Sequence, residues 1–279
     1  MGVDVGATLA KLAVREPGGE LCFDFLPAGA VEAVAHRIRT LSAARVGLTG
    51  CGATGLAEQL GQPSARIVEF DAWGRGSKEL LARQHEDADA PYLLVSLGTG
   101  TSVLQVEGTH TLRLGGSALG GGTVLGLGVA LTGCESYEEL CKLARSGRRG
   151  NVDLLVSDIY RPGEVPIPGE VTAASFGNLA RWLTPGSSGA APAHGDPSRR
   201  EDLASSVMGL VGENVALISC GHSTTAGIPR IVYGGATLRG NPALVTVLMG
   251  VTAALGREPI LLEEGGFAGA LGALALAEA

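Results

Sequence analysis

The same short pattern occurs twice in the sequence: an apolar strand, a turn of glycine and hydroxyl residues, and two further strands. The first copy covers residues 1–27 and turns at residues 6–8, and the second opens at residue 92 and turns at residues 98–102. Apolar runs bounded by glycine-rich turns predict strands joined as hairpins. We therefore predict a duplicated α/β domain whose two turns oppose each other across a cleft.

The residues around the first turn suit a site for phosphate and a metal ion. Asp4 lies on the first strand, Gly6 and Thr8 form the turn, and Lys11 follows. A glycine lets backbone N–H groups approach phosphate oxygens, a threonine hydroxyl adds a donor, and a carboxylate can hold Mg²⁺ directly or through water. An ordinary hairpin without a ligand can have the same residues, so the rest of the sequence is needed to distinguish the two interpretations.

Composition excludes several classes of protein. Hydrophobic residues make up 45% of the 279 residues and charged residues only 18%, which favours a folded core over disorder. The formal net charge of −7 argues against a nucleic-acid partner. We find no apolar run long enough to span a bilayer and no signal peptide before Asp4, and five scattered cysteines indicate reduced thiols, so we expect a cytoplasmic protein without a membrane partner.

Apolar periodicity predicts the remaining elements. Helices are expected at residues 30–42, 55–60, 69–85, 124–131, 136–146, 201–219, 241–255 and 268–277, and strands at 44–49, 66–70, 230–233 and 259–262. A polar stretch that ends at Pro91 predicts a boundary between domains 1–90 and 91–279. Residues 186–197 are rich in Gly, Ala, Ser and Pro and indicate a long loop.

Two charged residues occupy positions where α/β folds bind ligands. Glu69 lies where a strand leads into a helix, and Arg113 ends the third strand of the second copy. A glycine-rich loop then enters a helix at residues 115–123, which is typical of an anion or nucleotide site. Taken alone, Glu69 also fits a helix N-terminal acid, and Arg113 also fits an ordinary cation at a strand end.

An ordered set of segments resembles the type II (eukaryotic-like) pantothenate kinases of the actin/sugar kinase/Hsp70-like ATPase superfamily. The segments are DVGATLAK, LTGCGA, EFDAWGRG, SLGTGTS, GGSALGGGTVLGL, LLVSDIY, ASFGN, IVYGGATLRGN and EEGGFAGALGAL. They run from Met1 to about Leu274, nearly the whole chain. The chain departs from the family pattern at Ala7 and at Cys51, where the family usually has glycine.

The resemblance implies two ribonuclease H-like (actin-like ATPase) domains, each with a mixed five-stranded sheet flanked by helices, and a nucleotide cleft between them. It implies ATP-dependent phosphorylation of pantothenate to 4'-phosphopantothenate, the first step of coenzyme A biosynthesis, with Mg²⁺. It also implies a homodimer, with coenzyme A or acyl-CoA as a candidate feedback inhibitor.

Site residues follow from the same resemblance. Glu69 matches the catalytic base that takes the proton from the pantothenate hydroxyl, and Arg113 matches an arginine that contacts substrate and stabilises the transferring phosphoryl. Thr99 and Ser102 match hydroxyl positions that contact phosphate or substrate, and Asp4 matches the metal position. The implied nucleotide and phosphate contacts are Asp4, Gly6, Thr8, Lys11, Gly98, Thr99, Gly100, Gly121, Gly122, Thr123, Gly234 and Gly235. A helix N-terminus beside Glu69 is expected to lower its pKa.

Three alternatives stay open at this point. A superfamily kinase could act on another small hydroxyl substrate, such as an N-acetylhexosamine. An ATPase module could activate a partner, as the activators of radical dehydratases do, with Cys134 as its one candidate cluster ligand near a helix start. A nucleotide-binding regulator without turnover would explain the departures at Ala7 and Cys51.

Overall fold

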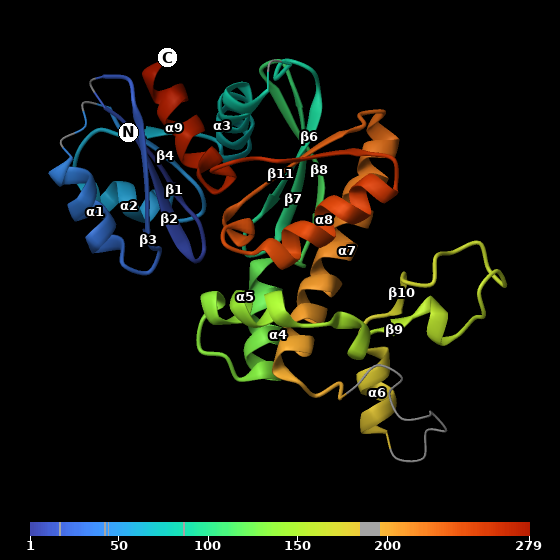
Figure 1. Cartoon of the computed structure of the whole chain (residues 1–279). Helices are drawn as coiled ribbons and strands as arrows, with labels where there is room; N and C mark the ends of the chain where they lie inside the picture. The colour runs from blue at the N-terminus through green and yellow to red at the C-terminus, as the bar shows by residue number, and fades with distance from the viewer. Residues whose placement is uncertain (17, 42, 44, 86, 185–195) are drawn as a thin grey trace. The chain divides into compact units, whose positions relative to one another are not determined.

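The computed structural model describes the chain except residues 17, 42, 44, 86 and 185–195, and the described residues form two units (Figure 1). The first unit contains residues 1–118, 218–239 and 252–279, and the second contains residues 119–217 and 240–251. Both five-stranded sheets lie in the first unit. The predicted site residues from Asp4 to Arg113, together with Gly234 and Gly235, therefore belong to that unit.

The first sheet has the strand order β3-β2-β1-β4-β5. Its strands are β1 (Gly2–Val5), β2 (Leu9–Arg15), β3 (Leu21–Pro27), β4 (Gly47–Thr49) and β5 (Ala65–Arg66). The first three strands are antiparallel, whereas β4 and β5 run parallel to β1. Side chains of β1 alternate between the faces, so Val3 packs with helices α1 (Val31–Thr40) and α2 (Ala53–Leu60).

The second sheet repeats this topology with the order β12-β11-β6-β7-β8. Its strands are β6 (Tyr92–Leu97), β7 (Thr101–Glu107), β8 (His110–Ser117), β11 (Arg230–Gly234) and β12 (Glu258–Leu261). Here β6, β7 and β8 form the antiparallel hairpins, and β11 and β12 are the parallel strands. The predicted duplication and the mixed five-stranded sheets are thus confirmed.

Helices α3 (Glu69–Gln84) and α9 (Ala268–Glu278) pack against each other within the first unit (Figure 1). Glycines make this close approach possible: a Cβ at Gly76 would overlap the backbone of Ala268, and one at Gly272 would overlap the backbone of Ala72. Helix α9 also lies against β1, β2 and β4. The C-terminal end of the chain is therefore part of the core around the first hairpin.

Replacing Gly272 with alanine should lower the free energy of unfolding by about 3 kcal/mol, because the new methyl group would have to push two helix backbones apart. Urea unfolding measures this change. Gly55 in α2 is the control, since nothing lies within 4 Å of the Cβ that alanine would add. Gly55→Ala should instead stabilise the protein by about 0.5 kcal/mol, and a similar loss in both variants would contradict this close packing.

The second unit consists mainly of helices. It contains α4 (Gly121–Thr132), α5 (Tyr137–Ser146), α6 (Gly177–Leu183), most of α7 (Arg200–Ala226) and most of α8 (Pro242–Ala254), with the short β9 (Leu154–Leu155) and β10 (Thr172–Ala174). Ser136 is the N-cap of α5, because its hydroxyl accepts a hydrogen bond from the Glu139 N–H at 3.1 Å.

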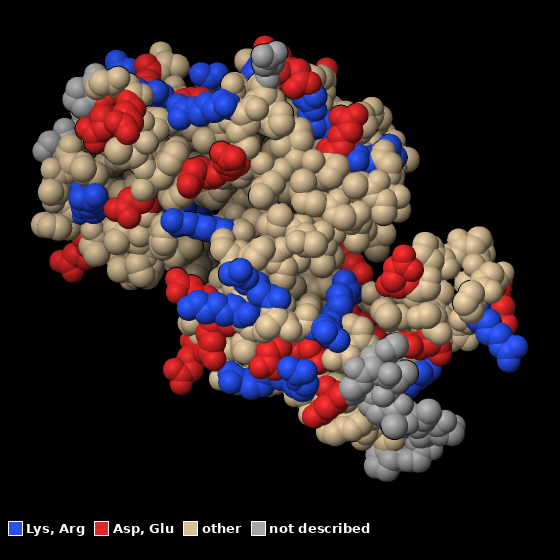
Figure 2. Space-filling view, in the orientation of Figure 1, with Lys and Arg blue, Asp and Glu red and all other residues tan. Residues whose placement is uncertain are grey.

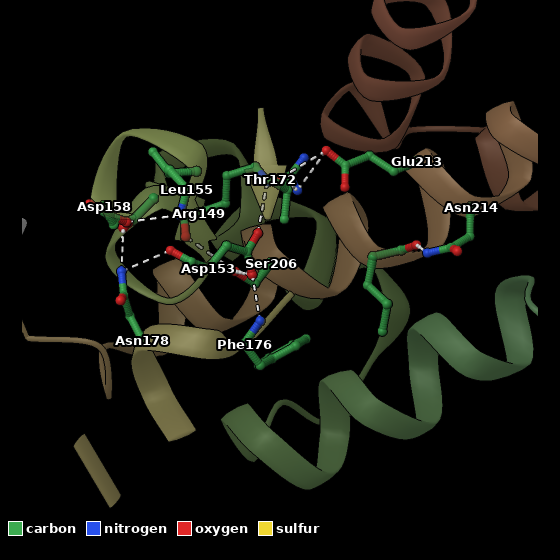
Figure 3. A network of polar contacts seen from close by, with 12 residues as sticks. Arg149, Asp153, Leu155, Asp158, Thr172, Phe176, Asn178, Ser206, Glu213 and Asn214 are labelled. Carbon is green, nitrogen blue, oxygen red and sulfur yellow. Dashed lines mark hydrogen bonds and ion pairs between the residues drawn. The ribbon is translucent and has the colours of Figure 1, made fainter. Parts of the chain in front are cut away.

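A buried polar network connects β9 and β10 to α7 in this unit (Figure 3). The Arg149 guanidinium lies 2.9 Å from Asp153 Oδ2 and 2.9 Å from Glu213 Oε1, and Thr172 Oγ1 accepts a hydrogen bond from it at 2.7 Å. Asp153, which is fully buried, also accepts hydrogen bonds from Ser206 Oγ and the Phe176 N–H, both at 2.9 Å. Because every charge in this network is paired, removing one partner would leave an uncompensated buried charge.

Helix α7 is the one described helix that is long and apolar enough to cross a membrane by length and composition. However, 67% of its apolar window is buried inside the protein, as in the core helix of a folded domain. On the face shown in Figure 2, basic and acidic side chains are interspersed.

Most of the predicted elements are present, with different ends. Helix α4 begins three residues earlier than expected, α7 extends to Ala226, and the strand expected at 66–70 is only two residues long, Ala65–Arg66. The proposed boundary at residue 90 falls between α3 and β6 and stays a prediction. Most of the expected loop at 186–197, namely residues 186–195, lies outside the described residues.

Candidate active site

Asp4 lies at the C-terminal edge of the first sheet, near the end of β1. Its side chain is almost fully buried, at 3% exposure, and Oδ2 lies 3.3 Å from the Lys11 Nζ on the neighbouring strand. The other oxygen, Oδ1, has no hydrogen-bond partner among the described residues. A buried carboxylate with one unpaired oxygen is costly unless a ligand completes it, so Asp4 is a candidate ligand-binding residue.

The turns of the two hairpins meet. Gly6 closes the first turn by donating its N–H to the Leu9 carbonyl at 3.0 Å, and Gly98 closes the second by donating to the Gly100 carbonyl at 2.9 Å. The exposed hydroxyls of Thr8 and Thr99 lie 3.3 Å apart. The structure therefore brings together two glycine turns that leave hydroxyl groups open to solvent.

Glu69 is the first residue of α3 and is half-buried. Burial raises the pKa of its carboxyl above the ordinary glutamate value, the nearby Asp4 charge raises it further, and Lys11 opposes both effects. The sequence predicted a lowered pKa from the helix N-terminus, and that expectation is wrong. Burial and the charge of Asp4 are the two largest causes of the raised pKa, and both come from residues that folding brings together.

Arg113 lies on β8 beside an irregularity in the β7–β8 pairing, where Leu104 pairs with Arg113 and Val103 with Gly115. Its side chain is exposed, and its guanidinium carbon lies 6.0 Å from the ring centre of Phe70, the residue after Glu69. Arg113 can therefore reach a ligand beside the start of α3. Ser102 on β7 is half-buried and lies on the same strand edge, paired with Gly116.

A glycine-lined pocket lies between Asp4 and the second sheet. The residues around it are Asp4, Lys11, Trp73, Leu94, Ser96, Gly98, Gly234, Gly235, Ala236, Gly265, Gly266, Ala268 and Gly269. Gly235 has φ +112°, a conformation that favours glycine, and a Cβ there would overlap the backbone of Leu97. Backbone N–H groups can approach a ligand closely in such a pocket.

The sequence analysis missed several of these pocket residues. Trp73 was interpreted as core, and it does pack against the hydrophobic core, but it also lines the pocket. Ser96, Gly265, Gly266 and Gly269 all stood in segments of the resemblance, but none of them was predicted as a site residue. Gly121, Gly122 and Thr123 form the first turn of α4 and belong to the second unit.

Comparisons with known proteins identify the family of this chain. The profile of the Fumble family matches residues 50–276. The type II pantothenate kinases of Staphylococcus saprophyticus and Staphylococcus haemolyticus are 35% and 36% identical to this chain over 276 residues, which is 99% of each sequence. The chain belongs to the type II pantothenate kinase family. It is accordingly a kinase that uses ATP.

Solved structures with low sequence identity share the fold of this type II pantothenate kinase family member. The activator of 2-hydroxyisocaproyl-CoA dehydratase from Clostridium difficile, solved with ADPNP, has a TM-score of 0.62 at 16% identity and covers 99% of this chain and 92% of its own. A ROK family glucokinase from Streptomyces griseus, solved with glucose and AMPPNP, has a TM-score of 0.56 at 16% identity. The match covers 99% of this chain and 98% of the glucokinase chain. These similarities show an actin-like ATPase fold.

The two departures from the family's glycine pattern do not strain the backbone. Ala7 and Cys51 are both exposed, and neither is among the described non-glycine residues with positive φ, which are Phe176 and Glu264. A residue with negative φ does not need to be glycine. Both turns can therefore keep the family's conformation. Cys134, the candidate cluster ligand of the activator alternative, is buried.

The residues around Asp4 fit a magnesium ion. Asp4 Oδ1 is a buried carboxylate oxygen without a protein partner, which is the donor type that Mg²⁺ prefers. No group of three His, Cys, Asp or Glu side chains capable of holding a metal occurs in the described part of the chain. Magnesium in kinases needs no such group, because substrate phosphates and water supply most of its ligands.

Proposed function

We propose that this chain phosphorylates pantothenate at its primary hydroxyl, using ATP and Mg²⁺, to give 4'-phosphopantothenate. The observation that carries this proposal is the half-buried Glu69 carboxyl, whose pKa is raised by burial and by the nearby charge of Asp4 on the first strand of the first hairpin. A carboxylate there can face an acceptor hydroxyl beside the triphosphate. The full-length similarity to type II pantothenate kinases supports pantothenate as that acceptor.

Glu69 orients the acceptor hydroxyl and takes its proton. Phosphoryl transfer passes through a loose transition state, so the proton leaves late and the orientation of the hydroxyl matters more than the strength of the base. The raised pKa of Glu69 nevertheless makes it a better proton acceptor than an ordinary glutamate. Its half-buried position leaves one side open to the substrate.

Arg113 stabilises the charge on the transferring phosphoryl group and contacts the substrate. Its exposed guanidinium offers several N–H donors to phosphate oxygens, and its contact with Phe70 places it close to Glu69. Thr99 and Ser102 add hydroxyl groups that bind phosphate or pantothenate from the second hairpin.

The first hairpin holds the metal and the phosphates. A magnesium ion bound beside Asp4 would neutralise negative charge on the triphosphate. Lys11 fixes the Asp4 carboxylate through its 3.3 Å ion pair, and Thr8 donates from the turn. The remaining phosphate and nucleotide contacts that we propose are Gly6, Gly98, Gly100, Gly121, Gly122, Thr123, Gly234 and Gly235.

ADP release in the presence of single acceptors tests the proposed function. Pantothenate should give turnover in a typical kinase range of about 1–100 s⁻¹. N-acetylhexosamines and simple alcohols should give little more ADP than ATP alone. Turnover with another alcohol and none with pantothenate would replace the substrate assignment, and ATP hydrolysis that needs a protein partner would favour an activator.

We also propose a homodimer, with coenzyme A or its thioesters as inhibitors. Helix α4 offers apolar surface for such an interface, because Leu125, Leu127, Val129 and Leu131 are 36–42% exposed. A second copy of the chain could cover this apolar surface. A cytoplasmic location and the lack of nucleic-acid and membrane partners stay predictions.

A further inference from the structure

Thr49, the last residue of β4, lies directly beside Asp4 in the first sheet. The two residues are register partners in the parallel β1–β4 pair. Gly2 and Gly47 lie two residues earlier on the two strands. A Cβ added at either glycine would point at the backbone of α9. Because side chains two residues apart share a face of the sheet, Asp4 and Thr49 both face the α9 side.

The hydroxyl of Thr49 has no partner although the residue is buried. Thr49 is 1% exposed, and its Oγ1 has no hydrogen-bond partner among the described residues. An unpaired buried hydroxyl costs about 1–3 kcal/mol, and valine would fill the same volume without that cost. Packing therefore gives no reason for a threonine here, whereas a bound ligand does.

Thr49 and its register partner Asp4 each carry a buried side-chain oxygen without a partner among the described residues. Only three side-chain atoms in the described part of the chain are buried without a partner, and Asp4 Oδ1 and Thr49 Oγ1 are two of them. Gly50 follows Thr49 with φ +88°, and a Cβ there would lie 2.6 Å from Asp4 Oδ1. The backbone at Gly50 thus keeps a side chain away from the Asp4 carboxylate.

We infer that Thr49 is a positioning residue for the hydrated divalent cation of the nucleotide. Its hydroxyl accepts a hydrogen bond from a water of the cation's hydration shell, and Asp4 Oδ1 binds the same hydrated cation. Magnesium keeps several of its waters when it binds proteins, so a hydroxyl and a carboxylate side by side can hold it through water. This inference rests on the proposed function only through the use of a magnesium nucleotide and not through pantothenate.

The test is Thr49→Val, which removes the hydroxyl and keeps the shape of the side chain. ADP binding is followed by the fluorescence of Trp73, which lines the pocket with Asp4, in a Trp182→Phe background that removes the other tryptophan. In a MgCl₂ titration at fixed ADP, the variant should need about tenfold more Mg²⁺ at the midpoint. Its ADP affinity in EDTA should not change, and Thr49→Ser should restore the normal midpoint.

Thermal unfolding without ligands separates this role from a structural one. Thr49→Val should leave the Tm unchanged or raise it, because no hydrogen bond is lost. The matched control is Thr252→Val, since buried Thr252 makes a 2.7 Å hydrogen bond with the Tyr233 hydroxyl. The control should lower the Tm and keep the normal Mg²⁺ midpoint.

An unchanged Mg²⁺ midpoint in Thr49→Val would overturn the inference, whatever its Tm. ADP binding by the unmodified protein that does not depend on Mg²⁺ would overturn it as well. Neither readout contains pantothenate. A failure of the substrate assignment would therefore leave a raised midpoint in Thr49→Val intact, and a failure of the Thr49 inference would leave pantothenate turnover intact.

Discussion

Replacing Glu69 with glutamine should lower kcat with pantothenate about 10³-fold, while the KM for ATP changes little. Glutamine keeps the size of the side chain and can still accept a hydrogen bond through its carbonyl oxygen, but it cannot take the proton of the acceptor hydroxyl. Coupled ADP release at saturating substrates measures the loss. Asp71→Asn is the matched control, because Asp71 is an exposed carboxylate in the same first turn of α3.

The pH dependence gives an independent check on Glu69. Because burial and the charge of Asp4 raise its pKa, Glu69 becomes protonated, and the rate should fall, at a pH above the ordinary glutamate value of about 4.3. Glu69→Gln should lose this acidic limb. A residual rate of Glu69→Gln near that of the unmodified enzyme, or an unchanged acidic limb, would remove Glu69 from the mechanism.

The same pKa direction predicts that Glu69→Gln is not less stable. The folded pKa lies above the unfolded one, so the protonated form is favoured in the fold, and its contribution to stability is lost as pH rises through the folded pKa. At neutral pH the charged carboxylate therefore opposes folding, and a neutral glutamine removes that opposition. The Tm of Glu69→Gln at pH 7 should equal or exceed that of the unmodified protein, which separates lost chemistry from lost structure.

Replacing Arg113 with alanine should lower kcat about 10³-fold or more, because a guanidinium that stabilises the transferring phosphoryl group contributes on that scale. Arg113 is exposed, and its contact with the Phe70 ring contributes little to stability, so the Tm should change little. Arg113→Lys should recover part of the rate, since lysine keeps the charge but loses the planar pair of donors. Single-turnover kinetics would locate the effect in the chemical step.

Arg75→Ala serves as the control for Arg113, because Arg75 is another exposed arginine, on α3. It should leave kcat within about twofold, as a surface charge outside the site would. A comparable loss in both variants would indicate a general effect of positive charge on substrate attraction. A loss in KM alone would limit Arg113 to substrate binding.

Much of the architecture could be predicted from local patterns. The strands of both hairpins and the turns at Gly6 and Gly98 follow from apolar runs and glycines that are close together in the sequence. Helix ends were less predictable, as at α4 and α7, because packing rather than propensity decides how far a helix continues. The position of Glu69 at the start of α3 was predicted correctly.

The electrostatics of the site were not predictable in this way. Local sequence places Glu69 at a helix N-terminus, which alone would lower its pKa, yet burial and Asp4 raise it. Trp73 faces both core and pocket because α9 approaches α3 so closely that Gly269 lies beside its ring. This contact joins residues almost two hundred positions apart, so no local periodicity of the sequence could have predicted it.

Residue order alone was enough for the repeated hairpin, its glycine turns and the family to which the chain belongs, because each of these depends on neighbours along the chain. Folding decided which oxygens are left without a partner. Asp4 Oδ1 and Thr49 Oγ1 become a pair only when β4 lies parallel to β1 under α9. Hydrogen bonding and burial are properties of the assembled neighbours, so the chemistry of this site appears only in the tertiary structure.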